Sequence, residues 1–136
     1  MNLFAQWPKE MYDKLPSVVF EHIAMALEHG NGERTMKEVR EDIQDGSKQV
    51  WVHSTDDVFD FTMVTQIVEH PSKKICEVVY SGGSGMLKAL DEVKVIEEWA
   101  KLCGCTDIHA IGRKYMVKSL APYGYTQRYV TVGREL

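Results

Sequence analysis

Apolar residues in the first third of the chain recur three and four positions apart, which is the period of an α-helix. This spacing predicts a short helix over residues 8–15, opened by a proline, and a second over residues 16–28 that stops at a glycine-containing stretch. A third helix is predicted over residues 35–46. It begins with Thr35 and Glu38, whose spacing is that of a capping box.

The pattern changes from a helical to an alternating period after residue 49. Val50 and Val52 flank Trp51 in a first strand, and after a turn at residues 54–57 a longer strand over 59–67 follows. Its residues on one face are expected to be Phe59, Phe61, Met63, Thr65 and Ile67, and the two strands predict a β-hairpin. Residues 75–80 form a third, more apolar strand in which Glu77 is the only charged residue. Three consecutive antiparallel strands are therefore expected.

The last third of the chain returns to a mixed pattern. Apolar residues predict one long helix over residues 86–103, closed by a glycine. A strand over residues 107–111, a short helix over 114–120 and a final strand over 125–132 follow. This order predicts a mixed α/β (α+β) fold with a mostly antiparallel sheet of five to seven strands, flanked by about four helices.

The unit formed by the strand at 75–80, the long helix and the strand at 107–111 is expected to be parallel and right-handed. Parallel strands that part at their carboxyl ends leave backbone groups free beside the N-terminus of the connecting helix, so a ligand crevice is expected at that point. With 136 residues the chain has room for one core, and residues 1–136 are predicted to form a single domain.

The charge balance narrows the classes of partner. A formal net charge of −4 argues against nucleic acid or an anionic membrane as a general partner, because both would repel the average surface. Apolar stretches are too short to span a bilayer, and the N-terminal residues do not resemble a signal peptide. The chain has three cysteines, and no two of them form a CxxC pair. Because their number is odd and this spacing is absent, neither a disulfide framework nor a metal site is expected.

The stretch Tyr80-Ser81-Gly82-Gly83-Ser84-Gly85 connects the third strand to the long helix. One interpretation is an anion site, in which the N–H groups of Gly83, Ser84, Gly85 and Met86 hold a phosphate at the positive end of the helix dipole. The alternative is a simple strand-to-helix hinge with Ser84 as the helix cap and glycines that allow positive φ. Composition alone does not separate the two.

The order of elements together with this glycine turn resembles the GNAT superfamily of acyl-CoA N-acyltransferases. The family turn reads Gln/Arg-x-x-Gly-x-Gly/Ala, and this chain keeps both glycine positions but has Tyr80 where the family has Gln or Arg. Within the superfamily, the chain is most similar to small bacteriophage proteins of unassigned role, on the following segments: Thr65–Ile67, Tyr80–Gly83, Ile96–Ala100, Gly104-Cys105 and Ile111–Arg113.

The resemblance implies acetyl-CoA or another acyl-CoA as the donor substrate. Its pyrophosphate would be held by the turn, and the residues implied in binding are Tyr80, Gly82, Gly83, Ser84, Gly85 and Met86, with Arg113 as a further phosphate contact. For the chemistry, Glu77 is the candidate base and Tyr123 the candidate acid. The pattern favours an edge or solvent-facing carboxylate as the alternative role of Glu77. Leu120 stands where the family often places the tyrosine that acts as the acid.

Three hypotheses follow. The first is an enzyme that moves an acyl group from acyl-CoA to a small amine or a protein acceptor. The second is a degenerate GNAT scaffold that binds a phage or host protein, located in a bacterial cytoplasm or within a phage particle. The third is a small-ligand or regulatory binding module without turnover.

Overall fold

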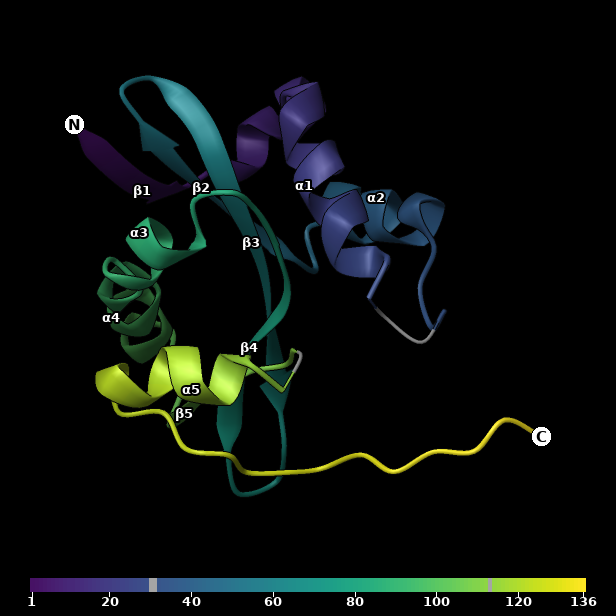
Figure 1. Ribbon diagram of the computed structural model, residues 1–136. Helices are drawn as coiled ribbons and strands as arrows, with labels where there is room; N and C mark the ends of the chain where they lie inside the picture. The colour runs from purple at the N-terminus through teal and green to yellow at the C-terminus, as the bar shows by residue number, and fades with distance from the viewer. Residues whose placement is uncertain (30–31, 113) are drawn as a thin grey trace.

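The computed structural model describes residues 1–29, 32–112 and 114–136 (Figure 1). Its strands are β1 (Asn2–Gln6), β2 (Gln49–Thr55), β3 (Val58–Glu69), β4 (Lys74–Gly83) and β5 (Asp107–Ala110). Its α-helices are α1 (Ser17–Leu27), α2 (Met36–Gln44), α3 (Met86–Leu90), α4 (Lys94–Leu102) and α5 (Met116–Leu120). Two 3-10 helices, η1 (Lys9–Lys14) and η2 (Ala121–Tyr123), complete the described elements.

The five strands form one sheet in the order β1-β2-β3-β4-β5. The pairs β1/β2, β2/β3 and β3/β4 are antiparallel, whereas β4 and β5 are parallel. This arrangement confirms the mixed fold class, with a mostly antiparallel sheet and one parallel pair.

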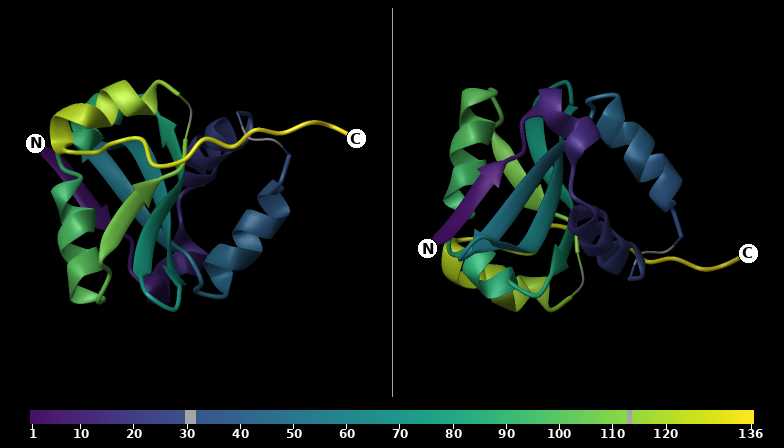
Figure 2. Two further views of the ribbon diagram at one scale, coloured as in Figure 1. Left: turned by 90° about the horizontal axis from the view of Figure 1, so that it is seen from below. Right: turned by 90° about the horizontal axis from the view of Figure 1, so that it is seen from above.

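Helices cover both faces of the sheet, and each face has its own apolar cluster (Figure 2). On one face, α3, α4 and α5 pack on side chains that include Trp51, Met63 and Cys76. On the other face, α1, α2 and η1 pack on Val50, Val52 and neighbouring residues. The sheet is therefore the middle of three layers.

The capping box predicted for the third helix is present. The Thr35 hydroxyl accepts a hydrogen bond from the Glu38 N–H at 3.3 Å, and the Glu38 carboxylate accepts one from the Thr35 N–H at 3.0 Å. The glycine-containing stop predicted before it includes residues 30 and 31, which lie outside the described residues.

Three predictions about elements were incomplete or wrong. The strand β1 was not predicted, because five residues are too few to establish an alternating period. The predicted strand over residues 125–132 is absent: this segment is extended but pairs with no strand among the described residues. The single long helix is two helices, because residues 91–93 form a turn in which the Val93 N–H bonds the Leu90 carbonyl at 3.2 Å.

A β-bulge in β4 changes the direction in which its residues point. Opposite β3, Val64 pairs with Tyr80 while Thr65 pairs with Val78, so Val79 is an extra residue in β4. Before the bulge, Cys76 and Val78 face α3 and α4; after it, Tyr80 packs in the cluster beneath α1 and α2. Because of this one additional residue, each side chain after Val79 points to the face of the sheet opposite to the one that a regular strand would give it.

The end of β4 packs closely on its neighbours. A Cβ atom on Gly82 would lie 1.9 Å from the carbonyl oxygen of His22 in α1, and one on Gly83 would lie 2.3 Å from the carbonyl oxygen of Asp60 in β3. Gly83 also has φ of +123°, which residues with a side chain rarely adopt. Both glycines are needed for this packing whatever the turn binds.

We expect Gly82→Ala to destabilise the protein by about 1 to 3 kcal/mol or more, because the added methyl group meets backbone atoms that cannot rotate away. Urea denaturation followed by circular dichroism measures the change. Gly133→Ala is the matched control, since no atom lies within 4 Å of that position, and it should leave the midpoint unchanged. Equal stability of the two variants would contradict the close contact with α1.

Candidate functional site

The parallel strands β4 and β5 part at Val78. Their ladder ends with the Ile111 N–H bonding the Val78 carbonyl at 2.9 Å, whereas β4 stays paired with β3 as far as Gly83. The separation begins next to the bulge at Val79. This is the splayed pair expected from the sequence, and it places the end of β4 and the start of α3 beside the same space.

The start of α3 carries free backbone donors. Gly85 is the N-cap residue and no side chain caps the helix, so the N–H groups of its first turn lack intrahelical acceptors. Ser84 is exposed and does not cap α3, contrary to the hinge interpretation. Lys88, in the same turn, is also exposed and adds a positive charge.

Asp60 anchors this turn to the sheet. Its carbonyl accepts a hydrogen bond from the Gly85 N–H at 2.9 Å. Its carboxylate accepts one from Thr55 Oγ1 at 2.7 Å and lies 2.6 Å from Nδ1 of the fully buried His53. Burial alone would raise the pKa of Asp60, but these two contacts outweigh it and leave the pKa below its ordinary value. The carboxylate is thus held ionised against Gly85.

Side chains fill most of the gap between β4 and β5 on the side of α3, α4 and α5. The cavity that remains has a volume of about 10 Å³, which is room for about one water molecule. Its lining residues come from β3, β4 and β5, from α3 and the turn after it, and from the segment around α5. They are Met63, Val78, Ser81, Leu90, Val93, Ala110, Met116, Leu120 and Tyr125. The arm of a CoA thioester does not fit inside this gap unless side chains such as Met116 rotate away.

Glu77 lies on the opposite face of the sheet, at the point where the strands part. It alternates with Cys76 and Val78, whose side chains face α3 and α4, and one of its oxygens accepts a hydrogen bond from Gln66 Nε2 at 2.8 Å. In the parallel ladder its direct partner is His109 of β5. A carboxylate and an imidazole therefore stand side by side at the edge of the gap.

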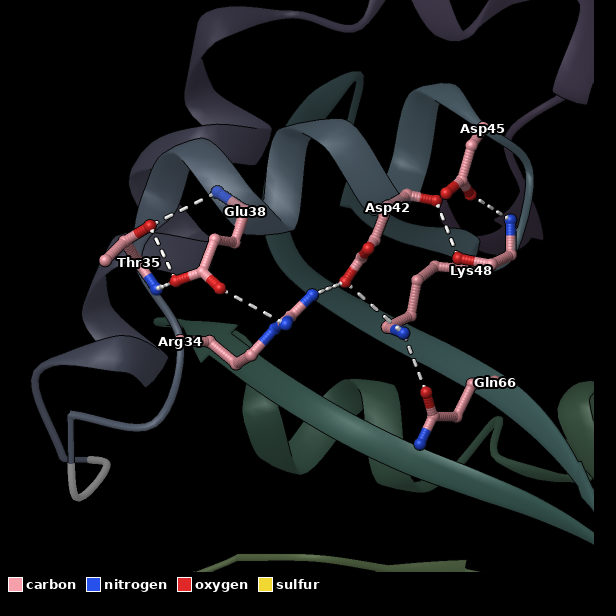
Figure 3. Close-up of polar contacts among 8 residues, drawn as sticks. Arg34, Thr35, Glu38, Asp42, Asp45, Lys48 and Gln66 are labelled. Atoms are coloured by element: carbon pink, nitrogen blue, oxygen red, sulfur yellow. Dashed lines mark hydrogen bonds and ion pairs between the residues drawn. The ribbon is translucent and has the colours of Figure 1, made fainter.

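A chain of polar contacts leads from Glu77 through Gln66 to α2. Figure 3 shows the part of this chain from Gln66 to Arg34. Gln66 Oε1 accepts from Lys48 Nζ at 2.7 Å, and Lys48 is 3.6 Å from the Asp42 carboxylate. Asp42 also binds Arg34, which lies 3.3 Å from Glu38. These contacts hold Gln66, and through it Glu77, in a fixed orientation.

Tyr80 belongs to this face and not to the glycine turn. Burial raises its pKa, and the nearby Arg34 lowers it in part. The bulge at Val79 accounts for its position, because it turns Tyr80 toward α1 and α2. The side chain of Tyr80 is therefore separated by the sheet from the first turn of α3.

The second catalytic candidate, Tyr123, lies in η2. Its hydroxyl donates a hydrogen bond to Asp91 in the turn between α3 and α4, and this contact raises its pKa. Tyr123 and Glu77 are thus on opposite sides of the sheet. Arg113 lies outside the described residues.

Four residues near the gap were not identified as site candidates from the sequence: Asp60, Ser81, His109 and Tyr125. Tyr125 lines the cavity, and its hydroxyl donates to Glu97 Oε2 at 2.8 Å; burial followed by this contact raises its pKa strongly. The sequence indicated only that His109 lies in a strand expected to pair with the strand of Glu77. That His109 stands directly opposite Glu77 follows from the register of β4 and β5 in the sheet.

The described residues show two further absences. They contain no group of three or more histidine, cysteine, aspartate or glutamate side chains that would hold a metal ion. In the same part of the chain, no helix has both the length and the apolar character needed to cross a membrane.

The arrangement of elements is that of solved acetyltransferases. An aminoglycoside acetyltransferase, meta-AAC0020 from an uncultured soil metagenomic sample, in complex with sisomicin, superimposes with a TM-score of 0.72 at 8% identity, covering 99% of this chain and 95% of the other. A predicted acetyltransferase from Clostridium acetobutylicum with acetyl-CoA gives 0.71 at 10% identity, with 98% and 96% covered. Glucosamine-6-phosphate N-acetyltransferase from Arabidopsis thaliana gives 0.69 at 11% identity, with 99% and 98% covered.

No protein-family model matches the chain, and no curated protein matches it in sequence. At identities near 10%, the likeness to solved structures establishes the fold. The chain therefore has the GNAT fold.

We expect Asp60→Asn to destabilise the protein by about 1 to 3 kcal/mol at pH 7, because it removes the ionised acceptor of His53 and Thr55. The folded-state pKa of Asp60 is lowered, so its contribution to stability is present above the unfolded pKa of about 3.9 and is lost as the pH falls through the folded-state pKa. Urea denaturation at pH 7 and near pH 2.5 should therefore show the difference from the parent protein shrinking in acid.

The neighbouring Asp57→Asn is the control, because Asp57 is an exposed turn residue with φ of 67°, which asparagine tolerates. Its effect should stay within about 0.5 kcal/mol. A penalty for Asp60→Asn that does not change with pH would contradict a role for the ionised carboxylate.

Proposed function

We propose that the protein is a GNAT-type N-acyltransferase that moves an acyl group from acyl-CoA to an amine. The observation that carries this proposal is a coincidence of three features at one place in the sheet. The parallel strands part at Val78, uncapped N–H donors of α3 lie at one side of the opening, and Glu77 with His109 lies at the other.

The donor substrate would bind through its phosphates at the start of α3. The backbone N–H groups of Met86, Leu87 and Lys88, together with the Lys88 ammonium, supply the donors and the positive charge. Bound there, with Met116 rotated out of the gap, acyl-CoA would supply the activated thioester. The Asp60 carboxylate lies behind Gly85, and its contacts with His53 and Thr55 reduce the repulsion that it would exert on a phosphate.

Glu77 would serve as the base. An amine that attacks the thioester carbonyl carbon forms the new amide bond as the C–S bond breaks, and it must lose a proton. Glu77 has one oxygen held by Gln66, which leaves the other to take that proton directly or through a water molecule. The departing thiolate takes up a proton from solvent, because Tyr123 donates its own hydrogen bond to Asp91 and is remote from Glu77.

The structures with the same fold support a small amine as acceptor. One of them binds the aminoglycoside sisomicin, and another is an N-acetyltransferase of glucosamine 6-phosphate. The acyl acceptor of this chain would accordingly be a small molecule with a primary amine, located on the α1/α2 side of β4 next to Glu77.

A scaffold without catalysis is the second candidate, and two observations favour it. The gap between β4 and β5 is nearly filled, and Gly82 and Gly83 are required by packing alone. None of the structures described above comes from a bacteriophage, so the phage origin, the phage or host protein partner and the location in a particle or a bacterial cytoplasm stay predictions from the sequence resemblance.

Acetyl-CoA titration by isothermal calorimetry tests the donor site. Ser84→Glu should weaken binding by at least about tenfold, because it places a carboxylate beside the phosphate donors at an exposed position that tolerates a larger side chain. Gly83 is unsuited to this test, since any side chain there meets the Asp60 carbonyl. Ser72→Glu, in the exposed turn at the far end of β4, adds the same charge and should leave affinity unchanged. No heat of binding with the parent protein would reject the acyltransferase and favour the scaffold.

Steady-state assays of thiol release with an amine acceptor test the base. We expect Glu77→Gln to lower kcat/KM by about 100-fold or more and to leave acetyl-CoA affinity unaltered, because it removes proton transfer while keeping the hydrogen-bonded shape. Glu69→Gln, on the neighbouring strand and exposed, is the control and should retain full activity. Undiminished activity of Glu77→Gln would exclude Glu77 as the base.

A further inference from the structure

His109 stands directly opposite Glu77, on the neighbouring strand. The two residues are Cα partners in the last pair but one of the parallel ladder between β4 and β5. Ile108 and Ala110 belong to the apolar cluster beneath α3, α4 and α5, so His109 between them points to the other face of the sheet, as Glu77 does. The imidazole and the carboxylate therefore share one side of the opening between the strands.

Both side chains keep hydrogen-bonding capacity for a ligand, and both are half-buried. One oxygen of Glu77 accepts from Gln66, and within the described residues the second oxygen accepts no hydrogen bond. In the same part of the chain, the His109 ring makes no hydrogen bond and packs on the nearly perpendicular ring of Tyr129, at a centroid distance of 5.9 Å. A carboxylate oxygen and an imidazole nitrogen are thus open to the same space.

The nearest charge to His109 on its own strand is already matched. Asp107 lies two residues earlier in β5, on the same side as His109. Hydrogen bonds from Thr106 and from Lys73, at 2.7 and 3.2 Å, lower the pKa of Asp107, and Arg128 adds a smaller effect. Asp107 is therefore occupied by cations and is not available to a ligand.

The charges beyond Glu77, toward α2, are matched as well. Lys48 donates to Gln66 at 2.7 Å and lies 3.6 Å from the Asp42 carboxylate (Figure 3). Among these described groups, Glu77 and His109 remain open to a ligand.

A primary amine brings one proton too many for acyl transfer. Near pH 7 it is an ammonium ion, because alkylammonium groups have a pKa of about 10. It must lose one proton before its nitrogen has a lone pair for the attack, and a second as the amide bond forms. A single carboxylate holds one proton at a time, so two proton acceptors beside the nitrogen match this requirement.

Given the acyl transfer proposed above, on which this rests, we propose that Glu77 and His109 act together on the amine: His109 takes the proton that frees the lone pair, and Glu77 takes the second proton as the amide forms. The nitrogen attacks the thioester carbonyl carbon of acyl-CoA, the C–N bond forms, and the C–S bond breaks with its electron pair on sulfur. The thiolate takes one proton from solvent, while His109 and Glu77 return two, so that one proton is released in total. Imidazole suits the first step because it exchanges protons near neutral pH.

Two amines of similar size separate the two roles. Ethylamine is an ammonium ion at pH 7, whereas trifluoroethylamine is mostly the free amine, because its fluorine atoms withdraw electrons from the nitrogen. In assays of thiol release, His109→Gln should lower kcat/KM for ethylamine by about 100-fold and for trifluoroethylamine by less than about threefold. Glu77→Gln should lower both values, because each amine still loses a proton as the amide forms.

The pH profile with ethylamine gives a second readout. Between pH 7 and pH 9, kcat/KM of His109→Gln should rise about tenfold per pH unit, because this variant depends on the free amine present in solution. The parent protein should level off in this range, since His109 removes the proton at the site. The affinity of both proteins for acetyl-CoA, measured by calorimetry, should be equal.

The matched control is His70→Gln, at an exposed histidine directly after β3, and it should leave both amines unaffected. Circular dichroism checks the fold of His109→Gln, and if this variant is unfolded, His109→Thr replaces it, because a β-branched residue suits a strand. Equal loss with both amines in a folded variant, or full activity with ethylamine, would overturn the role of His109 and leave the acyl transfer standing. If the parent protein releases no thiol with either amine, the acyl transfer is itself rejected, and the role of His109 with it.

Discussion

The bulge at Val79 is the constraint on which the rest of the structure depends. One extra residue in β4 reverses the facing of everything after it, so that Tyr80 and Gly82 turn toward α1 while Ser81 turns toward the gap. The bulge also coincides with the last hydrogen bond between β4 and β5. A regular β4 would place Gly82 on the α3 side and remove the close approach of α1 to the end of the strand.

The glycine turn is required for the packing of the fold whether or not it binds a ligand. Gly82 makes room for the His22 carbonyl, Gly83 takes a positive φ against Asp60, and Gly85 begins α3 while bonded to Asp60. These packing roles account for the three glycines without any bound phosphate. The function proposed above uses other groups, namely the exposed first turn of α3 and the pair of Glu77 and His109, which the sheet holds in register.

Much of the fold followed from local patterns. The capping box at Thr35 depends on neighbours in sequence, and it is present in the structure. Residues 59–67 lie in strand β3 as predicted, but Phe59 packs on the α1/α2 face while Phe61 and Met63 pack on the other face. The site was less accessible. Glu77 was identified because a charge in an apolar strand stands out, whereas Asp60 and His109 look ordinary in sequence and gain significance from contacts with residues 7 and 32 positions away.

The sequence by itself determined the mixed fold and most of the helices and strands between residues 9 and 120, because hydrophobic period, caps and turn residues act over a few positions. The tertiary structure alone decided that Tyr80 packs beneath α1 and α2, that Tyr123 bonds Asp91, that side chains fill most of the gap, and that residues 125–132 pair with no strand among the described residues. The physical reason is that facing, register and strand partners are set by packing between distant segments. The one-residue bulge at Val79 changes the facing and the register of β4, and the residues on either side of it give no sign of it in the sequence.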